Sequence, residues 1–355
     1  MTRPLPWPRD TLPLMLAPMQ GVTNRAVRQV FAQWVRPDVL FTEFMRVRPG
    51  GDGGAARLSQ GDLADAKPQE HGVPLVAQLI GRDREVLLEA AREVQGAGAV
   101  HLNLNMGCPY GRMNVGCGGG MLERPEELPD ILGALREAIP GSFSVKVRAG
   151  YADPEQVFSL LPVFEAAGVD FLVLHARTVV QRYEGHADHG ITARVVQQTR
   201  LPVIANGDIR TVEGGHRVLE QTRAAGLMLG RGALQDPLLF ERLRGRASAA
   251  PTEDELRGTH QRFLRELAQR YGALFCGDAQ VLARLKGSLA VMDVPEESKP
   301  YRALRKAKSV RAFCEAVEAL AARTAGRTRE GTGSQTLGVG VEAGKDIVPL
   351  QVARP

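Results

Sequence analysis

Short apolar runs that recur at a regular spacing constrain the fold of this chain more than any other feature of the sequence. Eight such runs occur between residues 14 and 232, and most are followed by a segment with helical periodicity. Eight alternations of strand and helix are the number that a (β/α)8 barrel requires. We therefore predict an α/β fold, a (β/α)8 TIM barrel, with strands over residues 14–19, 39–45, 74–81, 100–107, 144–150, 171–177, 202–208 and 226–232.

The main structural alternative is a doubly wound parallel sheet. That fold usually has fewer strands and a glycine-rich turn after the first strand. The corresponding residues here are Ala17, Pro18 and Met19, none of which is glycine. The pattern therefore favours the barrel.

The alternation of strands and helices ends at about Pro237. Beyond it, helices without strands are expected at about 253–271, 277–292 and 299–325. Residues beyond 325 are rich in Gly, Thr and Ser and have little periodicity. We therefore predict a barrel, a helical domain and a flexible tail over 1–245, 246–325 and 326–355. Within the barrel, residues 49–73 are expected to form a long polar loop.

Composition narrows the class of protein. Hydrophobic residues make up 44% and charged residues 24%, as in ordinary globular proteins, and no apolar run approaches the roughly 20 residues that cross a bilayer. The N-terminal segment has no secretory signal pattern, so we expect a cytoplasmic protein. The four cysteines lack C-x-x-C spacing, so we expect neither a metal site nor a disulfide framework.

The net charge of +5 is concentrated in one part of the chain. Residues 241–325 hold 16 basic and 11 acidic side chains, whereas residues 1–240 hold 25 and 26. Six cations fall within 13 residues with no acid between them, at Lys299, Arg302, Arg305, Lys306, Lys308 and Arg311. Such a cluster suits a polyphosphate partner, although a solvated helix face would have the same pattern.

Polar residues occur at the ends of six predicted strands. In a barrel, the carboxyl ends of the strands face one mouth, where active sites are built. The residues concerned are Gln78, Asn105 with Cys108, Lys146 with Arg148, His175 with Arg177, Asn206 with Asp208, and Arg231. We therefore expect a functional site at this mouth.

Two glycine turns at the last two strand ends indicate what the site binds. Gly207 and Gly230 allow backbone N–H groups to approach an anion, and the corresponding loops of barrels often bind phosphate.

Lys146 and Arg148 alternate with valines, so both cations point to one side of their strand. A lysine there would stabilise the negative charge of a reduced flavin. The alternative is a structural ion pair between Lys146 and Glu43.

Cys108 is the candidate for acid–base chemistry. It lies beyond a strand end, before Pro109, and an unperturbed thiol is mostly protonated at neutral pH. That protonation state suits a proton donor better than a nucleophile.

Nine sequence blocks in this order resemble the tRNA-dihydrouridine synthases, over residues 12–323. The blocks are LAPMQGVTN (16–24), TEFMRV (42–47), QLIG (78–81), NMGCP (105–109), GCGGGML (116–122), SVKVRAG (144–150), HART (175–178), IANGDI (204–209) and GRGA (230–233). The resemblance implies FMN-dependent reduction of a uridine in the tRNA D loop, with NADPH as the transient reductant. It implies that FMN would pass hydride to C6 of the base while Cys108 protonates C5. The FMN-binding residues would be Pro18, Met19, Gln20, Gln78, Lys146, His175, Asn206, Gly207, Asp208, Gly230 and Arg231.

The resemblance also implies which residues contact the substrate. Asn105, Arg148 and Tyr183 would hold the base. Four further cations resemble those of the bacterial C subfamily, whose members modify position 16. They would contact tRNA and are Arg46, Arg284, Lys286 and Arg311. We expect the protein to act as a monomer.

Two other functions stay open on the sequence. A barrel similar to dihydroorotate dehydrogenase would use the same flavin residues on a free pyrimidine, but would leave the basic helical segment unexplained. A non-catalytic RNA-binding barrel would need no special placement of Cys108, Lys146 and His175.

Overall fold

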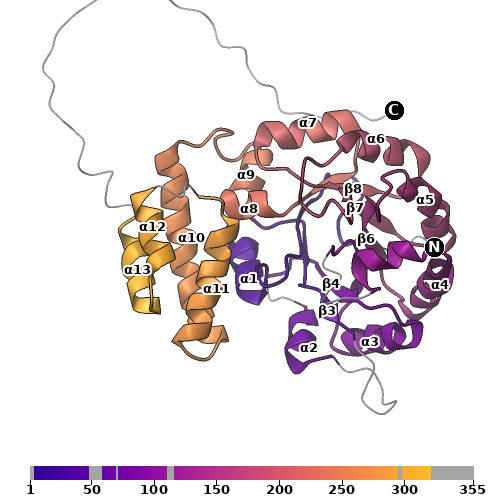
Figure 1. The fold of residues 1–355 in the computed structure, drawn as a ribbon, viewed down its shortest axis with the longest axis horizontal. Helices are drawn as coiled ribbons and strands as arrows, with labels where there is room; N and C mark the ends of the chain where they lie inside the picture. Colours follow the sequence, from indigo (N-terminus) through magenta and orange to yellow (C-terminus); the bar gives the residue numbers. More distant parts are fainter. Residues whose placement is uncertain (1–3, 48–57, 69–70, 110–115, 295–297, 321–355) are drawn as a thin grey trace, which may run out of the picture.

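The computed structural model describes residues 4–47, 58–68, 71–109, 116–294 and 298–320. Parallel strands form a closed barrel surrounded by helices, which confirms the predicted fold (Figure 1). The strands are β1 (Leu14–Leu16), β2 (Val39–Phe41), β3 (Met45–Arg46), β4 (Leu75–Ile80), β5 (His101–Met106), β6 (Phe143–Gly150), β7 (Phe171–Thr178), β8 (Val203–Asn206) and β9 (Gly226–Leu229).

Two short strands share the second position of the barrel. β2 pairs with the start of β4, matching Leu40 with Leu75, and this pairing closes the barrel. β3 pairs with the end of β4, matching Met45 with Leu79. The prediction of one strand over 39–45 is therefore wrong in detail. Between β2 and β3, the side chain of Thr42 accepts the N–H of Gln78 at 2.9 Å, so a hydroxyl occupies a place in the strand ladder.

Helices connect the strands on the outside of the barrel. They are α1 (Arg25–Trp34), α2 (Gln60–Ala66), α3 (Arg84–Gly96), α4 (Leu128–Ala138), α5 (Gln156–Ala166), α6 (His189–Gln198), α7 (Val212–Thr222), α8 (Arg231–Gln235) and α9 (Leu239–Leu243), with 3-10 turns η2 (Gly118–Glu123) and η3 (Pro125–Glu127).

The prediction of an uninterrupted loop over 49–73 is wrong, because α2 lies within that range. Ser59 and Asp62 form a capping box, in which each side chain bonds the backbone N–H of the other residue. The spacing of these two residues was visible in the sequence. The part of the range over 48–57 lies outside the described residues.

The lumen of the barrel is divided into an apolar and a polar part. Trp7 packs edge-on against Phe171 at 4.8 Å between ring centroids. These rings belong to a buried cluster that contains Met15, Val39, Val76 and Ile204. Because apolar side chains fill this part of the lumen, the polar residues at the carboxyl ends of the strands lie above a closed floor.

Four further helices follow the barrel, as predicted for a helical region. They are α10 (Glu253–Leu274), α11 (Asp278–Val291), α12 (Lys299–Lys306) and α13 (Val310–Glu318). A single helix over 299–325 was expected, but the chain is extended at Ala307 and Ser309 caps α13 by accepting the N–H of Ala312 at 3.1 Å. Residues 321–325 and the predicted tail lie outside the described residues.

The helical region packs against α1, which lies between it and the strands (Figure 1). Phe31 of α1 contacts Phe263 of α10 at 5.7 Å between centroids, within one hydrophobic cluster that continues through α11 and α13. Asn24 donates to the buried hydroxyl of Tyr271 at 3.2 Å, and that hydroxyl lies 3.1 Å from Oγ of Ser288. These contacts hold α11 beside the loop that follows β1. No helix in the described part of the chain is long and apolar enough to cross a membrane.

Candidate active site at the barrel mouth

A row of hydrogen-bonded polar side chains, three amides and a serine hydroxyl, crosses three adjacent strands. Gln78 of β4 donates to Oδ1 of Asn103 at 2.8 Å and accepts from Nδ2 of Asn105 at 2.9 Å. Asn103 donates in turn to Oγ of Ser144 at 2.8 Å. All four side chains are buried. Because every amide is oriented by its neighbours, Asn105 is held in one orientation beside Cys108.

Cys108 is half-buried and follows β5 closely. The side-chain carbonyl of Asn105 accepts its backbone N–H at 2.9 Å and that of Gly107 at 3.0 Å. The backbone carbonyl of Cys108 accepts the N–H of Gly119 at 3.0 Å, which folds η2 beside the cysteine. The turn that presents this thiol is therefore fixed on both sides.

Lys146 extends from β6 toward β8. Its ammonium donates to Oδ1 of Asn206 at 2.9 Å, and Asn206 donates to the carbonyl of Met228 at 2.8 Å. Burial, together with the nearby cation Arg148, lowers the pKa of Lys146 to about 7. The alternative pairing with Glu43 is not observed. Glu43 instead has a pKa raised to about 7, because burial outweighs the attraction of Arg28 and Arg284.

His175 is buried on β7 beside Asn206 in the strand register. Burial lowers the pKa of its imidazole well below the usual value, and the cations Lys146, Arg148, Arg177 and Arg231 act in the same direction. Its Nε2 lies 3.2 Å from Nη1 of Arg177, which can only donate. The imidazole is therefore neutral at pH 7, with Nε2 as an acceptor.

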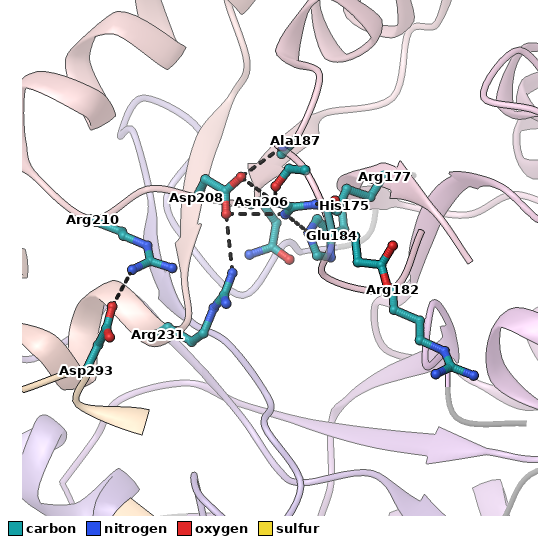
Figure 2. Close-up of polar contacts among 12 residues, drawn as sticks. His175, Arg177, Arg182, Glu184, Ala187, Asn206, Asp208, Arg210, Arg231 and Asp293 are labelled. Atoms are coloured by element: carbon teal, nitrogen blue, oxygen red, sulfur yellow. Dashed lines mark hydrogen bonds and ion pairs between the residues drawn. The ribbon is translucent and has the colours of Figure 1, made fainter. Parts of the chain in front are cut away.

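Asp208 connects three segments of the mouth, as Figure 2 shows. It accepts from Arg177 at 2.7 Å, from the N–H of Ala187 at 2.8 Å and from Arg231 at 3.3 Å. Burial opposes its ionisation, but these donors outweigh burial and lower its pKa. Asp208 is therefore an anion that fixes the turn after β8.

The loops after β1, β8 and β9 meet at one side of the mouth. Gly207 has φ of +119°, and a Cβ there would lie 2.7 Å from Cβ of Ala187 and 2.9 Å from Cδ2 of His175. Gly230 lies beside Met19, whose Sδ would be 3.5 Å from an added Cβ. Pro18 and Met19 are half-buried and Gln20 is exposed.

These residues fit a phosphorylated flavin. Gly207 lets the turn after β8 pack directly against Ala187 and His175, where any larger residue would collide with both. Lys146 and Arg231 supply positive charge, while Gln78, Asn206 and neutral His175 supply oriented polar groups. Of the predicted flavin-binding residues, Gln78, Lys146 and His175 lie in the interior of their strands and Asn206 ends β8. The others follow β1, β8 and β9, with Arg231 as the first residue of α8.

Arg148 binds three backbone carbonyls through its guanidinium and also hydrogen-bonds the side chain of Tyr183. Only 1% of it is exposed, and it donates to the carbonyls of Gly107 at 2.7 Å, Thr178 at 2.9 Å and Arg182 at 2.6 Å. Tyr183 is 45% exposed and its ring lies 5.4 Å from the guanidinium carbon of Arg148. Tyr183 thus faces the mouth, whereas Arg148 acts from beneath it.

The cations predicted to contact a large substrate are spread over two regions. Arg46 of β3 lies near Cys117, whose pKa is raised by burial and lowered in part by Arg82 and Arg46. Arg284 of α11 approaches the carbonyl of Gly21 at 3.5 Å, and Lys286 lies two residues further along α11. Arg46 and Arg284 therefore lie at loops of the mouth.

Arg311 is separated from that mouth. It is 88% exposed on α13 and pairs with Glu315 at 3.0 Å. α13 lies at the outer edge of the helical region, with α10 and α11 nearer the barrel (Figure 1). The structure therefore does not bring Arg311 together with the other predicted site residues.

Sequence reasoning missed the roles of Asn103 and Arg177. Asn103 lies two residues before Asn105, so the strand alternation already placed both on one face. Arg177 was noted only as a strand-end residue, and no local pattern indicates its pairing with Asp208, 31 residues later.

The fold and this mouth define a (β/α)8-barrel enzyme with a polar site at the carboxyl ends of its strands. The family model described as "Dihydrouridine synthase (Dus)" matches residues 15–315. The chain therefore belongs to the dihydrouridine synthase family and is an enzyme of that family, a flavin-dependent oxidoreductase.

Among curated relatives, the tRNA-dihydrouridine(16) synthase of Ralstonia nicotianae is 33% identical over 68% of this chain and 76% of its own length. The protein of the same name from Cupriavidus necator is 34% identical over the same shares. The tRNA-dihydrouridine synthase B of Pasteurella multocida is 31% identical over 64% of this chain and 67% of its own.

A solved structure of a morphinone reductase mutant in complex with tetrahydroNAD has a similar fold. Its TM-score is 0.50 at 15% identity, covering 69% of this chain and 90% of that chain. This likeness concerns the barrel fold alone.

Proposed function

We propose that the protein reduces a uridine in the D loop of tRNA, at position 16, to 5,6-dihydrouridine, with FMN as cofactor and NADPH as reductant. The observation that carries the proposal is the fixed turn of Cys108 beside Asn105 and Lys146, in a barrel of the dihydrouridine synthase family. Relatives named tRNA-dihydrouridine(16) synthase support position 16.

FMN would be held by the turns at Met19, Gly207 and Gly230, with Lys146, His175 and Asp208 around it. When bound, FMN supplies the hydride that reduces C6 of the uracil ring. The ammonium of Lys146 would stabilise negative charge on the pyrimidine side of the flavin, and exclusion of water from the mouth would strengthen this effect.

Cys108 would supply the proton. Reduction of the C5–C6 double bond needs one hydride at C6 and one proton at C5, and the thiol of Cys108 would donate that proton and become a thiolate. The nearby cations Lys146 and Arg148 would stabilise the thiolate, since each interacts electrostatically with Cys108. Asn105, oriented by Gln78, would hold the uracil edge.

The barrel over 1–245 would carry the chemistry, and the helical domain over 246–325 would bind tRNA. Arg46, Arg284 and Lys286 would contact the RNA backbone near the everted base. Arg311 and the exposed cations of α12 would extend that contact away from the mouth. We propose that the protein acts as a cytoplasmic monomer and binds NADPH transiently at the same mouth.

The test uses purified FMN-loaded protein, NADPH and unmodified tRNA transcripts, with dihydrouridine mapped by sequencing. We expect reduction at position 16, and none in a transcript with cytidine at that position. Reduction only at another D-loop position would overturn the choice of position 16. Turnover of free uracil or orotate without tRNA would favour a barrel similar to dihydroorotate dehydrogenase. A colourless protein inactive after FMN addition would favour a non-catalytic RNA-binding barrel.

A further inference from the structure

The segment between β7 and α6, residues 179–188, presents Tyr183 at the mouth; we call it the Tyr183 segment. The carbonyls on both sides of this tyrosine are held by different buried arginines. Arg148 of β6 donates to the carbonyl of Arg182 at 2.6 Å. Arg177 of β7 donates to the carbonyl of Glu184 at 3.2 Å and to that of Gly185 at 2.6 Å. The backbone is thus fixed immediately before and immediately after Tyr183.

Arg177 has a second role in the same network. Two of its nitrogens bond the carboxylate of Asp208, at 2.7 and 3.2 Å, and Asp208 also accepts the N–H of Ala187 in the Tyr183 segment. Figure 2 shows Arg177 between Asp208 on one side and Arg182 and Glu184 on the other. A planar guanidinium can reach all these acceptors at once, whereas an ammonium cannot.

The tyrosine ring itself lies beside two cations. The guanidinium carbons of Arg148 and Arg231 lie 5.4 Å and 5.2 Å from its centroid. Arg231 pairs with Asp208, so the same carboxylate anchors Arg177 below the segment and Arg231 beside the ring. Together these contacts fix the orientation of the Tyr183 side chain at the mouth.

We propose that Arg177 is a positioning residue for substrate binding: it fixes the Tyr183 segment to the Asp208 turn so that the tyrosine is held ready to contact the edge of the everted base. This inference rests on the proposed function. Arg177 is 2% exposed, so it acts through Tyr183 and not by touching RNA. Preorganisation of this kind lowers the entropic cost of ordering a loop when substrate binds.

The first test measures hydrogen exchange of the backbone amides of the segment, and needs neither tRNA nor turnover. Arg177→Lys keeps the positive charge but removes the planar guanidinium and with it most of the N–H donors that bond the segment and Asp208. In the FMN-free protein, we expect amides of residues 179–187 to exchange hydrogen at least about tenfold faster than in the wild type, from the loss of charge-assisted hydrogen bonds. Unchanged exchange in this segment would overturn the inference.

The matched control is Arg136→Lys. Arg136 is also buried, pairs with Asp170 at 2.7 Å and bonds the carbonyls of Ile139 and Gly141, but it lies before β6, at the opposite end of the barrel. We expect this variant to lose thermal stability without faster exchange in residues 179–187. Equal acceleration in both variants would show a general loss of stability and overturn the positioning role.

The second test is a double-mutant cycle on the affinity for tRNA transcript, at saturating FMN. Since a net hydrogen bond contributes about 0.5–1.5 kcal/mol, Tyr183→Ala should weaken binding by up to about tenfold, and Arg177→Lys by a similar or smaller factor. If Arg177 acts through Tyr183, the double variant should bind like Tyr183→Ala alone. Losses that multiply in the double variant would overturn the inference.

Two further outcomes are distinguishable. If wild-type protein neither binds nor reduces tRNA, the proposed function fails, while hydrogen exchange still reports whether Arg177 holds the segment. If Arg177→Lys does not fold, Asp208→Asn takes its place in both tests, because it removes the charge that anchors Arg177. The loss of tRNA affinity caused by Asp208→Asn should likewise be absent when Tyr183 is already alanine. If Asp208→Asn weakens binding further in the Tyr183→Ala variant, the inference is overturned.

Discussion

Lys146 donates a hydrogen bond to Asn206 across the barrel mouth, although a whole strand, β7, lies between their own strands. The 2.9 Å contact joins a lysine in the interior of β6 to the last residue of β8. It orients the ammonium without neutralising it, because the acceptor is an amide oxygen. A charged group held in this way can respond to a new anion in the mouth.

The unfolding free energy of the flavin-free protein should increase with pH above 7 because of Lys146. Its pKa is about 7 in the folded chain and 10.5 when unperturbed, so the unfolded state binds more protons between these values. Stability from this group therefore rises across that range, by at most about 1.4 kcal/mol per pH unit. Urea unfolding at pH 7.0 and 8.5 measures the difference.

The comparison variant is Lys146→Met, in which the pH-dependent gain should disappear. Lys306→Met, at an exposed lysine of α12, should keep it. His175 does not interfere, because a lowered imidazole pKa changes stability only below about pH 6.5. An equal pH slope in wild type and Lys146→Met would contradict the buried ammonium.

Removing the thiol of Cys108 should stop turnover without removing the ligands. We expect Cys108→Ala to retain FMN and tRNA affinity and to lose about 10²–10⁴ in single-turnover rate, the usual range for a general acid. Cys117→Ala is the control, since Cys117 is also half-buried and lies near η2. Near-normal turnover in Cys108→Ala would reject its role as proton donor.

A methyl group at residue 207 should displace the cofactor. Gly207→Ala would place Cβ within 2.9 Å of His175 and in a backbone region that alanine rarely adopts. We expect FMN affinity to fall by at least about tenfold, from strain of roughly 1–3 kcal/mol. Fluorescence titration with FMN measures this loss. Gly258→Ala, on α10 where an added Cβ meets nothing within 4 Å, should leave the affinity unchanged.

The cations of α12 and its connection to α13 should contribute to RNA affinity through phosphate contacts. Arg302, Lys306 and Lys308 are exposed, whereas Arg305 donates to the carbonyl of Val294 at 2.7 Å and supports the fold. Replacing Arg302, Lys306 and Lys308 with Ala should reduce the salt dependence of tRNA binding by about 0.7–0.9 per lost phosphate contact.

The control for this prediction replaces Arg92 and Arg200, exposed cations on the outside of the barrel. Affinity is measured over a range of salt concentrations for both variants. Should the α12 variant keep the wild-type slope, its cations face solvent and not RNA. If the salt dependence of tRNA binding also falls in the control variant, the effect is caused by the change in net charge and not by specific phosphate contacts.

Much of the site was predictable because each strand ends in its own local pattern. Alternating apolar residues predicted the strands, and parallel strands bring their carboxyl ends together, so Gln78, Asn105, Lys146, His175 and Asn206 were expected at one mouth. The strand register places Asn105 beside Lys146 and His175 beside Asn206. Gly207 and Gly230 were recognisable because tight turns require glycine. These inferences needed only short stretches of chain.

Other features depended on residues that are distant in the sequence. Thr42 interrupts the second strand because its hydroxyl meets the N–H of Gln78. Arg148 is held beneath the surface by three carbonyls, from the end of β7 and from the loops after β5 and β7. Arg311 resembles the other cations in sequence, yet the packing of α13 carries it to the outer edge.

The sequence alone thus determined the barrel, the mouth and the chemical character of its residues, because periodicity and turn residues are local properties. Only the tertiary structure decided which polar groups are partners. Arg177 could have faced many acceptors, and its choice of Asp208 and the Glu184–Gly185 carbonyls follows from how β7, β8 and the segment between them pack. A hydrogen bond requires donor and acceptor within about 3 Å, and no local pattern encodes that distance for residues far apart in the chain.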